Sequence, residues 1–213
     1  MEFSTVGTQQ ESENRMNDIE KVINLYGIRE AVAKKFSICW SSLNGCIYHD
    51  HIWGDRRKDK TSWSHLTRII YECITNIKSG YMTLDAFEIK GDDSLTTKQK
   101  NKLLTDDHAL SVQSYGYFII SIFHNLIFEE FVSHLLIASQ TIITTKEENE
   151  VLSSFTLNEK GILKLEVPTS DRYMSAGIKK LWCTNNGHWV STDNFPITTS
   201  EEFLKFEKEQ LLT

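Results

Sequence analysis

The sequence has few of the features that mark disordered, disulfide-rich or membrane-spanning proteins. Its 213 residues include only two prolines, and apolar residues make up 40% of the chain. That composition is typical of a folded globular protein and argues against a disordered one. The four cysteines are too few for a disulfide-stapled fold. We therefore interpret Cys39, Cys46, Cys73 and Cys183 as reduced thiols.

No apolar run is long enough to cross a bilayer, which takes about 20 residues. The longest candidate runs from Tyr115 to Phe128, contains His124 and Asn125, and is followed by two glutamates. The N-terminal segment has neither the basic region nor the apolar region of a secretory signal. We therefore expect a cytoplasmic protein with no membrane partner.

Signatures of nucleophilic catalysis and of nucleotide binding are also missing. The sequence contains no G-x-S-x-G elbow, no P-loop and no G-x-G-x-x-G motif. For this reason we assign no catalytic residue and expect no cofactor.

The pattern of apolar residues predicts helices in the first two thirds of the chain. Apolar spacings of three and four predict one helix over 16–36 and another over 63–79. Gly27 is unfavourable inside the first, and a break there is the alternative. Residues 111–140 are apolar on nearly every face, which predicts a long central helix packed on several sides. Residues 1–13 are polar without a period and are predicted to be a disordered tail.

The last third of the sequence changes to strand patterns. Residues 161–167 alternate, and the segments 180–183 and 189–192 flank a turn signal at Asn185-Asn186-Gly187. Glu201 and Glu202 then open a C-terminal helix. The predicted fold class is therefore α+β: a helix-rich body around a long central helix, a small antiparallel sheet in the C-terminal third, and a C-terminal helix. Residues 14–213 are expected to form a single globular domain.

A cluster of thiols and imidazoles is one candidate site. Cys39, Cys46, His49 and His51 carry the ligand atoms that a tetrahedral zinc site needs. On a strand, the two histidines would lie on one face and could reach the same ion. Their spacing matches no common structural zinc pattern, and the alternative is two core thiols beside a surface loop.

The segment LDAFEIKG offers a second candidate. Its Glu88-x-Lys90 resembles the core of magnesium-dependent nucleases of the PD-(D/E)xK type. The resemblance implies that carboxylates hold the metal, while the lysine stabilises developing charge. A strand over residues 81–90 would put Glu88 and Lys90 on the same face. Asp85 precedes Glu88 by only three residues, whereas that family places its aspartate much farther upstream.

Two further patterns point to nucleic acid. The predicted body is similar in gross shape to helical ribonucleases of the HEPN type, whose motif is an arginine followed four to six residues later by a histidine. The nearest pair here is Arg57 and His65, with seven residues between them. Trp53 and Trp63 also interleave with basic residues near Arg57, an arrangement that can grip single strands. Neighbouring aspartates reduce the positive charge of that segment, so nucleic acid is not the expected partner.

The distribution of charge carries the leading functional hypothesis. The chain has 29 acidic and 23 basic side chains, for a net charge of −6. Residues 1–90 are neutral, so all of the excess negative charge lies in residues 91–213. A negative surface attracts basic partners and is repelled by phosphate backbones.

We therefore expect an acidic binding protein that neutralises a basic protein partner, in the manner of an immunity protein or an antitoxin against a nuclease toxin. The alternatives are the metal-dependent nuclease using Glu88 and Lys90, and a structural or regulatory domain. The partner-binding residues are predicted in the most negative stretch that also lies beside apolar residues. They are Glu129, Glu130, Glu147, Glu148 and Glu150.

Overall fold

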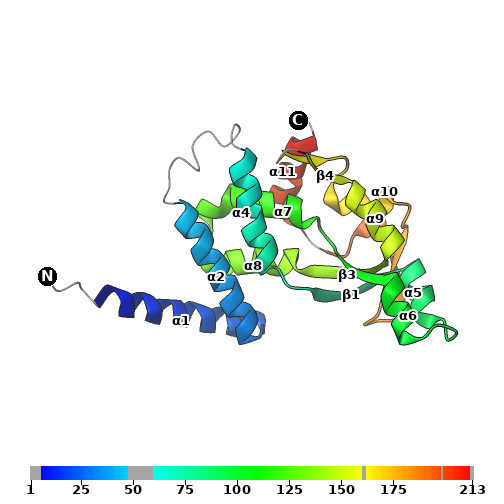
Figure 1. Ribbon diagram of the computed structural model, residues 1–213, viewed down its shortest axis with the longest axis horizontal. Helices are drawn as coiled ribbons and strands as arrows, with labels where there is room; N and C mark the ends of the chain where they lie inside the picture. Colours follow the sequence, from blue (N-terminus) through cyan, green and yellow to red (C-terminus); the bar gives the residue numbers. More distant parts are fainter. Residues whose placement is uncertain (1–5, 48–59, 160–161, 198, 212–213) are drawn as a thin grey trace.

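The computed structural model describes residues 6–47, 60–159, 162–197 and 199–211 (Figure 1). Its first part is helical, with α1 at Val6–Tyr26, α2 at Glu30–Ile47 and α4 at Lys60–Cys73. Gly27 separates α1 from α2 and has a φ of 63°, a conformation that glycine adopts without steric cost. The structure therefore has the alternative, a break at Gly27, in place of one helix over 16–36, and α1 begins at Val6, inside the segment predicted to be a tail.

The predicted central helix is two helices. Helix α7 covers Val112–Ile122, a short 3-10 turn η1 covers Phe123–Asn125, and α8 covers Phe128–Ala138. The chain turns where the Glu130 carboxylate accepts a hydrogen bond from the backbone N–H of Ile127, at 3.1 Å. This bond satisfies a free donor at the start of α8, so a new helix can begin there. The prediction of one continuous helix over 111–140 was wrong, because apolar periodicity does not reveal such a break.

A five-stranded sheet forms the second layer of the molecule. Its strands, in spatial order, are β2 (Leu104–His108), β3 (Gln140–Thr145), β1 (Ile77–Thr83), β6 (Lys180–Cys183) and β7 (His188–Ser191). Strands β1 and β3 pair in parallel, with Ile77 opposite Gln140, while the other neighbours are antiparallel. The α+β class is confirmed, and the β6–β7 hairpin is where it was predicted. The hairpin is joined by β1, β2 and β3, however, and the parallel pairing of β1 with β3 makes the sheet mixed.

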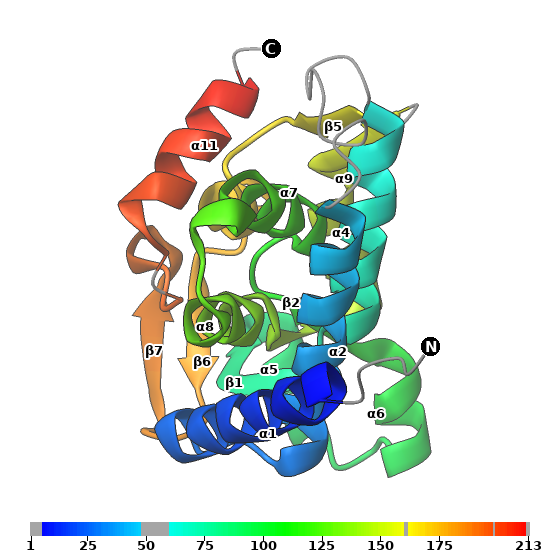
Figure 2. The same cartoon turned by 90° about the vertical axis from the view of Figure 1, so that its left-hand side faces the viewer.

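The remaining elements fill the connections between strands. They are α5 (Leu84–Gly91), α6 (Thr97–Leu103), α9 (Lys146–Ser154), the β4–β5 hairpin (Thr156–Glu159 and Ile162–Leu165), η2 (Thr169–Asp171), α10 (Arg172–Ser175), η3 (Thr192–Asn194) and α11 (Glu201–Leu211). Figure 2 shows α7 and α8 between α4 on one side and α11 with the β6–β7 hairpin on the other.

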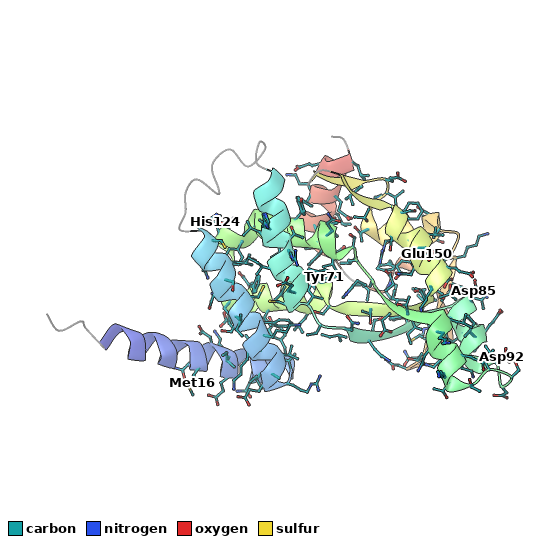
Figure 3. All side chains as sticks on the ribbon, viewed as in Figure 1. Met16, Tyr71, Asp85, Asp92, His124 and Glu150 are labelled. Carbon is teal, nitrogen blue, oxygen red and sulfur yellow. The ribbon has the colours of Figure 1, made fainter. Side chains whose placement is uncertain are left out.

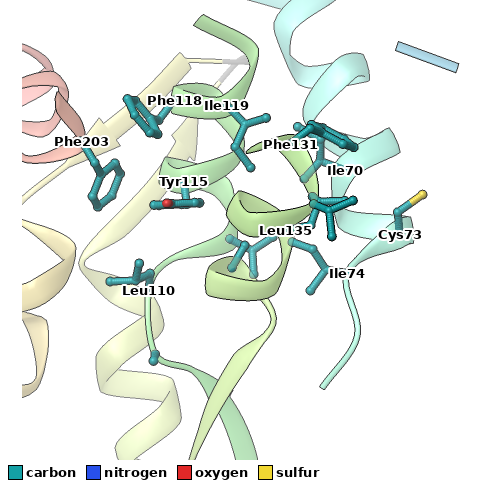
Figure 4. Close-up of a cluster of buried hydrophobic side chains, with 14 of the residues drawn as sticks. Ile70, Cys73, Ile74, Leu110, Tyr115, Phe118, Ile119, Phe131, Leu135 and Phe203 are labelled. Atoms are coloured by element: carbon teal, nitrogen blue, oxygen red, sulfur yellow. The ribbon is translucent and has the colours of Figure 1, made fainter. Parts of the chain in front are cut away.

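Aromatic side chains attach the C-terminal helix to the body. Phe203 of α11 is fully buried, and its ring centroid lies 4.6 Å from that of Tyr115 and 5.3 Å from that of Phe118 (Figure 4). The hairpin aromatics pack elsewhere, since Trp182 and Trp189 contact each other and Phe87 of α5. Helix α11 therefore packs on the central helical region, whereas the two tryptophans lie against α5.

Candidate functional site

The five predicted partner-binding acids form two separate groups. Glu129 and Glu130 lie in the first turn of α8, whereas Glu147, Glu148 and Glu150 lie on α9. Helix α8 and strand β3 run between the two groups. Figure 3 places His124, just before α8, and Glu150, on α9, toward opposite sides of the molecule. The five residues therefore do not share one element of the fold.

Glu129 is already paired within the protein. Its carboxylate forms a salt bridge with Lys21 of α1, and its side chain is only 13% exposed. The backbone carbonyl of the same residue accepts a hydrogen bond from the Tyr26 hydroxyl at 3.0 Å. The Lys21 ammonium lowers the pKa of the Glu129 carboxyl. Glu129 therefore joins α1 to α8 and is not free to contact a partner.

On α9, only part of the predicted group is free. One oxygen of Glu148 accepts hydrogen bonds from the Thr83 hydroxyl at 2.7 Å and from the Thr145 backbone N–H at 2.8 Å. Glu148 thus closes the first turn of its own helix and ties it to β1, a capping role. Glu147 and Glu150 are exposed.

A groove of about 730 Å³ gathers acidic side chains from two helices that are distant in the sequence. We call it the acid-lined groove. Its charged residues are Glu130 of α8 and three residues of α11, Glu202, Lys205 and Glu209. The rest of its lining comes from the end of α1, from α7 and η1, and from α8: Tyr26, Phe118, Ser121, Ile122, Asn125, Leu126, Ser133 and His134, with Phe206 from α11.

The charges in the acid-lined groove are only partly balanced. Glu130, Glu202 and Glu209 contribute three negative charges, and Lys205 contributes one positive charge. Glu130 and Glu202 both lie close enough to His134 to favour its charged form, but burial outweighs them and lowers the pKa of His134. The imidazole is therefore neutral at pH 7, and it does not offset the acids. Its Nδ1 lies 3.0 Å from the Tyr115 hydroxyl, which fixes the ring.

The acid-lined groove also has an apolar wall. Phe206 of α11 packs on the buried ring of Phe118, with centroids 5.8 Å apart, and the half-buried side chains of Phe206, Ile122 and Leu126 form this wall. Ile127, beside it in the chain, is 58% exposed. An apolar centre with charged residues around it is the arrangement that protein interfaces commonly use.

The nuclease hypothesis depended on a strand that is not there. Glu88 and Lys90 lie on helix α5, which begins where the Thr83 hydroxyl accepts a hydrogen bond from the Ala86 backbone N–H at 3.3 Å. Successive helical residues are about 100° apart, so two residues separated by one position point to nearly opposite sides. Glu88 and Lys90 are both exposed. They do not form the shared face that metal-assisted cleavage needs.

The two thiols of the predicted zinc cluster are not brought together. Cys39 and Cys46 both lie on α2, seven residues apart, so their backbones are about 10 Å apart along the axis. Zinc–sulfur bonds are about 2.3 Å, which is too short for both thiols to reach one ion. His49 and His51 lie outside the described residues, as do Trp53 and Arg57 of the nucleic-acid patterns. Within the described ranges, no three His, Cys, Asp or Glu side chains are placed to hold a metal.

Two other carboxylates lie inside the protein, and the sequence patterns missed both. Asp107 of β2 accepts hydrogen bonds from Arg172 and from the Tyr173 hydroxyl, and Arg172 also bonds to the carbonyl of His108. Asp107 and Arg172 are only 7% and 4% exposed, and burial raises the pKa of Asp107 despite the neighbouring guanidinium. No spacing in the sequence links residues 65 positions apart.

Glu207 of α11 is the second internal carboxylate. Its Oε1 accepts hydrogen bonds from the Ser114 hydroxyl at 3.1 Å and from the Thr169 backbone N–H and side-chain hydroxyl. Its side chain is fully buried, and burial raises its pKa. Glu207 follows Phe203 by four residues, which places both on the buried face of α11. That spacing was the available signal in the sequence.

No protein-family model matches the chain, and no curated protein or solved structure matches it either. Among the helices that the structure describes, none has the length and apolar character needed to cross a bilayer. The function is therefore argued from the geometry alone.

Proposed function

We propose that the protein binds a basic protein partner through the acid-lined groove. The observation that carries this proposal is the convergence of Glu202 and Glu209 with Glu130, which also caps α8, on an apolar wall that includes Phe206. Charges of one sign around an apolar centre favour a partner that presents lysine or arginine beside apolar side chains.

The expected biological role is neutralisation, as in an immunity protein or an antitoxin against a nuclease toxin. Nucleases carry basic surfaces because they bind phosphate backbones. An inhibitor of such a protein needs complementary charge and a few buried anchors, and it needs no catalytic group of its own. The acid-lined groove offers both features.

A labelled peptide tests the proposal directly. The probe is an amphipathic helical peptide with leucines on one face and arginines on the other, measured by fluorescence anisotropy. We expect binding that weakens as salt increases, because the Debye length falls from about 10 Å at 0.1 M to about 3 Å at 1 M. A peptide with glutamate in place of each arginine should not bind.

Two matched double variants locate the binding surface. Glu202→Lys with Glu209→Lys reverses two charges in the groove, and Glu147→Lys with Glu150→Lys reverses two charges on α9. Both pairs change the net charge by the same amount and both affect exposed side chains. The groove variant should slow association about tenfold or more at low salt, whereas the α9 variant should have a much smaller effect. Equal effects of the two variants, or equal binding of the acidic peptide, would overturn the proposal.

A further inference from the structure

Helices α2 and α4 pack side by side with two cysteines in their interface. The Lys35 ammonium of α2 donates a hydrogen bond to the carbonyl of Ile74, at 3.1 Å, just after α4 ends. One helical turn later in α2, the Cys39 thiol donates to the carbonyl of Ile69, at 3.8 Å. These two contacts bracket Cys73, which is one turn beyond Ile69 on the same side of α4. The register of the two helices therefore places Cys73 beside Cys39.

The two side chains are neighbours across the helix interface. The Ile69 carbonyl that accepts from the Cys39 thiol is also the acceptor, four residues back, for the backbone N–H of Cys73 in α4. Cys39 is fully buried, while Cys73 is 9% exposed at the end of its helix. Figure 4 shows the sulfur of Cys73 pointing away from Leu135 and Ile74. Cys39 is therefore the inner member of the pair, and Cys73 is the more exposed of the two.

Charges around the pair make the two thiols unequal. The neighbouring Cys39 thiol and the nearby Lys35 ammonium lower the pKa of Cys73. The neighbouring Cys73 sulfur and burial raise the pKa of Cys39. The Lys35 ammonium also offsets the negative end of the α4 dipole, which would otherwise disfavour a thiolate. A cysteine with a lowered pKa next to one with a raised pKa is the arrangement found in redox-active cysteine pairs.

We propose that Cys39 and Cys73 are a redox-active pair, which a hydroperoxide converts into a disulfide between α2 and α4. The Cys73 thiolate attacks the peroxide, whose O–O bond breaks to give a sulfenic acid on Cys73 and a hydroxide, or an alkoxide for an organic peroxide. The Cys39 sulfur then attacks the sulfenic sulfur, the S–O bond breaks, and the released oxygen leaves as water with the Cys39 proton. Both thiols are oxidised to the disulfide, and the peroxide is reduced.

The other two cysteines provide an internal comparison. Cys46 is half-buried near the end of α2, and Cys183 is buried in β6, where it contacts Tyr81. Neither belongs to the pair that Cys39 and Cys73 form, so neither should enter the disulfide. The proposal is independent of the acid-lined groove.

The test treats the reduced, full-length protein with hydrogen peroxide and maps its peptides without reduction. We expect the intact mass to fall by two hydrogen atoms, with one cross-link between Cys39 and Cys73 that dithiothreitol reverses. Because the cross-link constrains the unfolded chain, the melting temperature should rise by roughly 5–10 °C. A variant with Cys46→Ser and Cys183→Ser should behave in the same way.

Two further variants separate the steps. Cys39→Ser should leave a sulfenic acid on Cys73 that dimedone traps, and Lys35→Gln should slow the reaction of Cys73 several-fold. Recovery of Cys39 and Cys73 as free thiols after peroxide treatment would overturn the proposal. So would a cross-link that involves Cys46 or Cys183, or oxidation of Cys73 beyond the sulfenic acid in the wild-type chain.

Discussion

The carboxylates inside the protein and the carboxylates around the acid-lined groove have opposite surroundings. Asp107 and Glu207 are buried, and one oxygen of each accepts hydrogen bonds from protein donors, while Oε2 of Glu207 has no partner. Glu202 and Glu209 are exposed on α11 and face a groove that holds one lysine against three acids. The first pair interacts with groups inside the protein, while the second pair is exposed and available to a partner.

This difference explains why net charge alone was an incomplete guide. All of the excess negative charge falls in residues 91–213, but that total includes Asp107, Glu207, Glu129 and Glu148. Each of these four has partners within the protein. The predictions below test whether the internal acids contribute more to the stability of the fold than the groove acids do.

The largest effect is expected from breaking the internal ion pair. Arg172→Met leaves the buried Asp107 carboxylate without its guanidinium, and such a loss typically costs about 3–5 kcal/mol of stability. Urea denaturation followed by circular dichroism measures the change. Adding Asp107→Leu to Arg172→Met should recover much of the loss, because the unpaired charge is then removed. A double variant as unstable as the sum of the single variants would contradict this account.

A pH-dependent effect is expected at Glu207. Burial raises the pKa of this carboxyl in the folded protein above its unfolded value of about 4.3. The folded state therefore holds the proton more tightly, and stability falls as the pH rises from the unfolded pKa through the folded one.

Glu207→Gln removes this titration and keeps an oxygen to accept the bonds from Ser114 and Thr169. The free energy of unfolding of the variant, relative to wild type, should rise between about pH 4 and about pH 7. Denaturation curves at both pH values measure the difference. A difference that stays constant or falls over this range would show that the folded-state pKa is not raised.

The groove acids should matter little for folding. Glu202→Lys with Glu209→Lys is expected to change the free energy of unfolding by no more than about 0.5 kcal/mol, because exposed substitutions usually cost little. Thermal denaturation of this variant and of Glu147→Lys with Glu150→Lys provides the comparison. A loss of stability as large as that of Arg172→Met would show that the groove acids stabilise the fold, which would contradict this account.

A small effect is also expected at the salt bridge between α1 and α8. Lys21 is 63% exposed, and exposed pairs contribute about 0–1 kcal/mol. Lys21→Ala should therefore lower the free energy of unfolding by less than about 1 kcal/mol, and added salt should reduce the difference. An effect that persists at high salt would show that Lys21 acts through packing.

Local signals in the sequence predicted much of the fold. The β6–β7 hairpin and helix α11 were confirmed, and the alternative break at Gly27 was found, because each is specified by residues close together in the chain. The split of the central helix and the parallel pairing of β1 with β3 were not predicted, since both depend on contacts between distant segments.

The candidate site was predicted only in part. Glu130 was named from the sequence, but Glu202 and Glu209 were not. They approach Glu130 because Phe203 anchors α11 against Tyr115 and Phe118 of α7. A contact between residues nearly 90 positions apart leaves no local pattern in the sequence, so the groove can be recognised only in the folded structure.

The most direct test is site-specific photo-crosslinking in the source cells. A photoreactive amino acid replaces Asn125, which lines the acid-lined groove, or Val151, which is exposed on α9. The account predicts that the Asn125 position captures a basic protein, that the Val151 position does not, and that Glu202→Lys with Glu209→Lys abolishes the capture. Capture of acidic proteins at Asn125, capture of the basic protein only at Val151, or no capture at either position would contradict it.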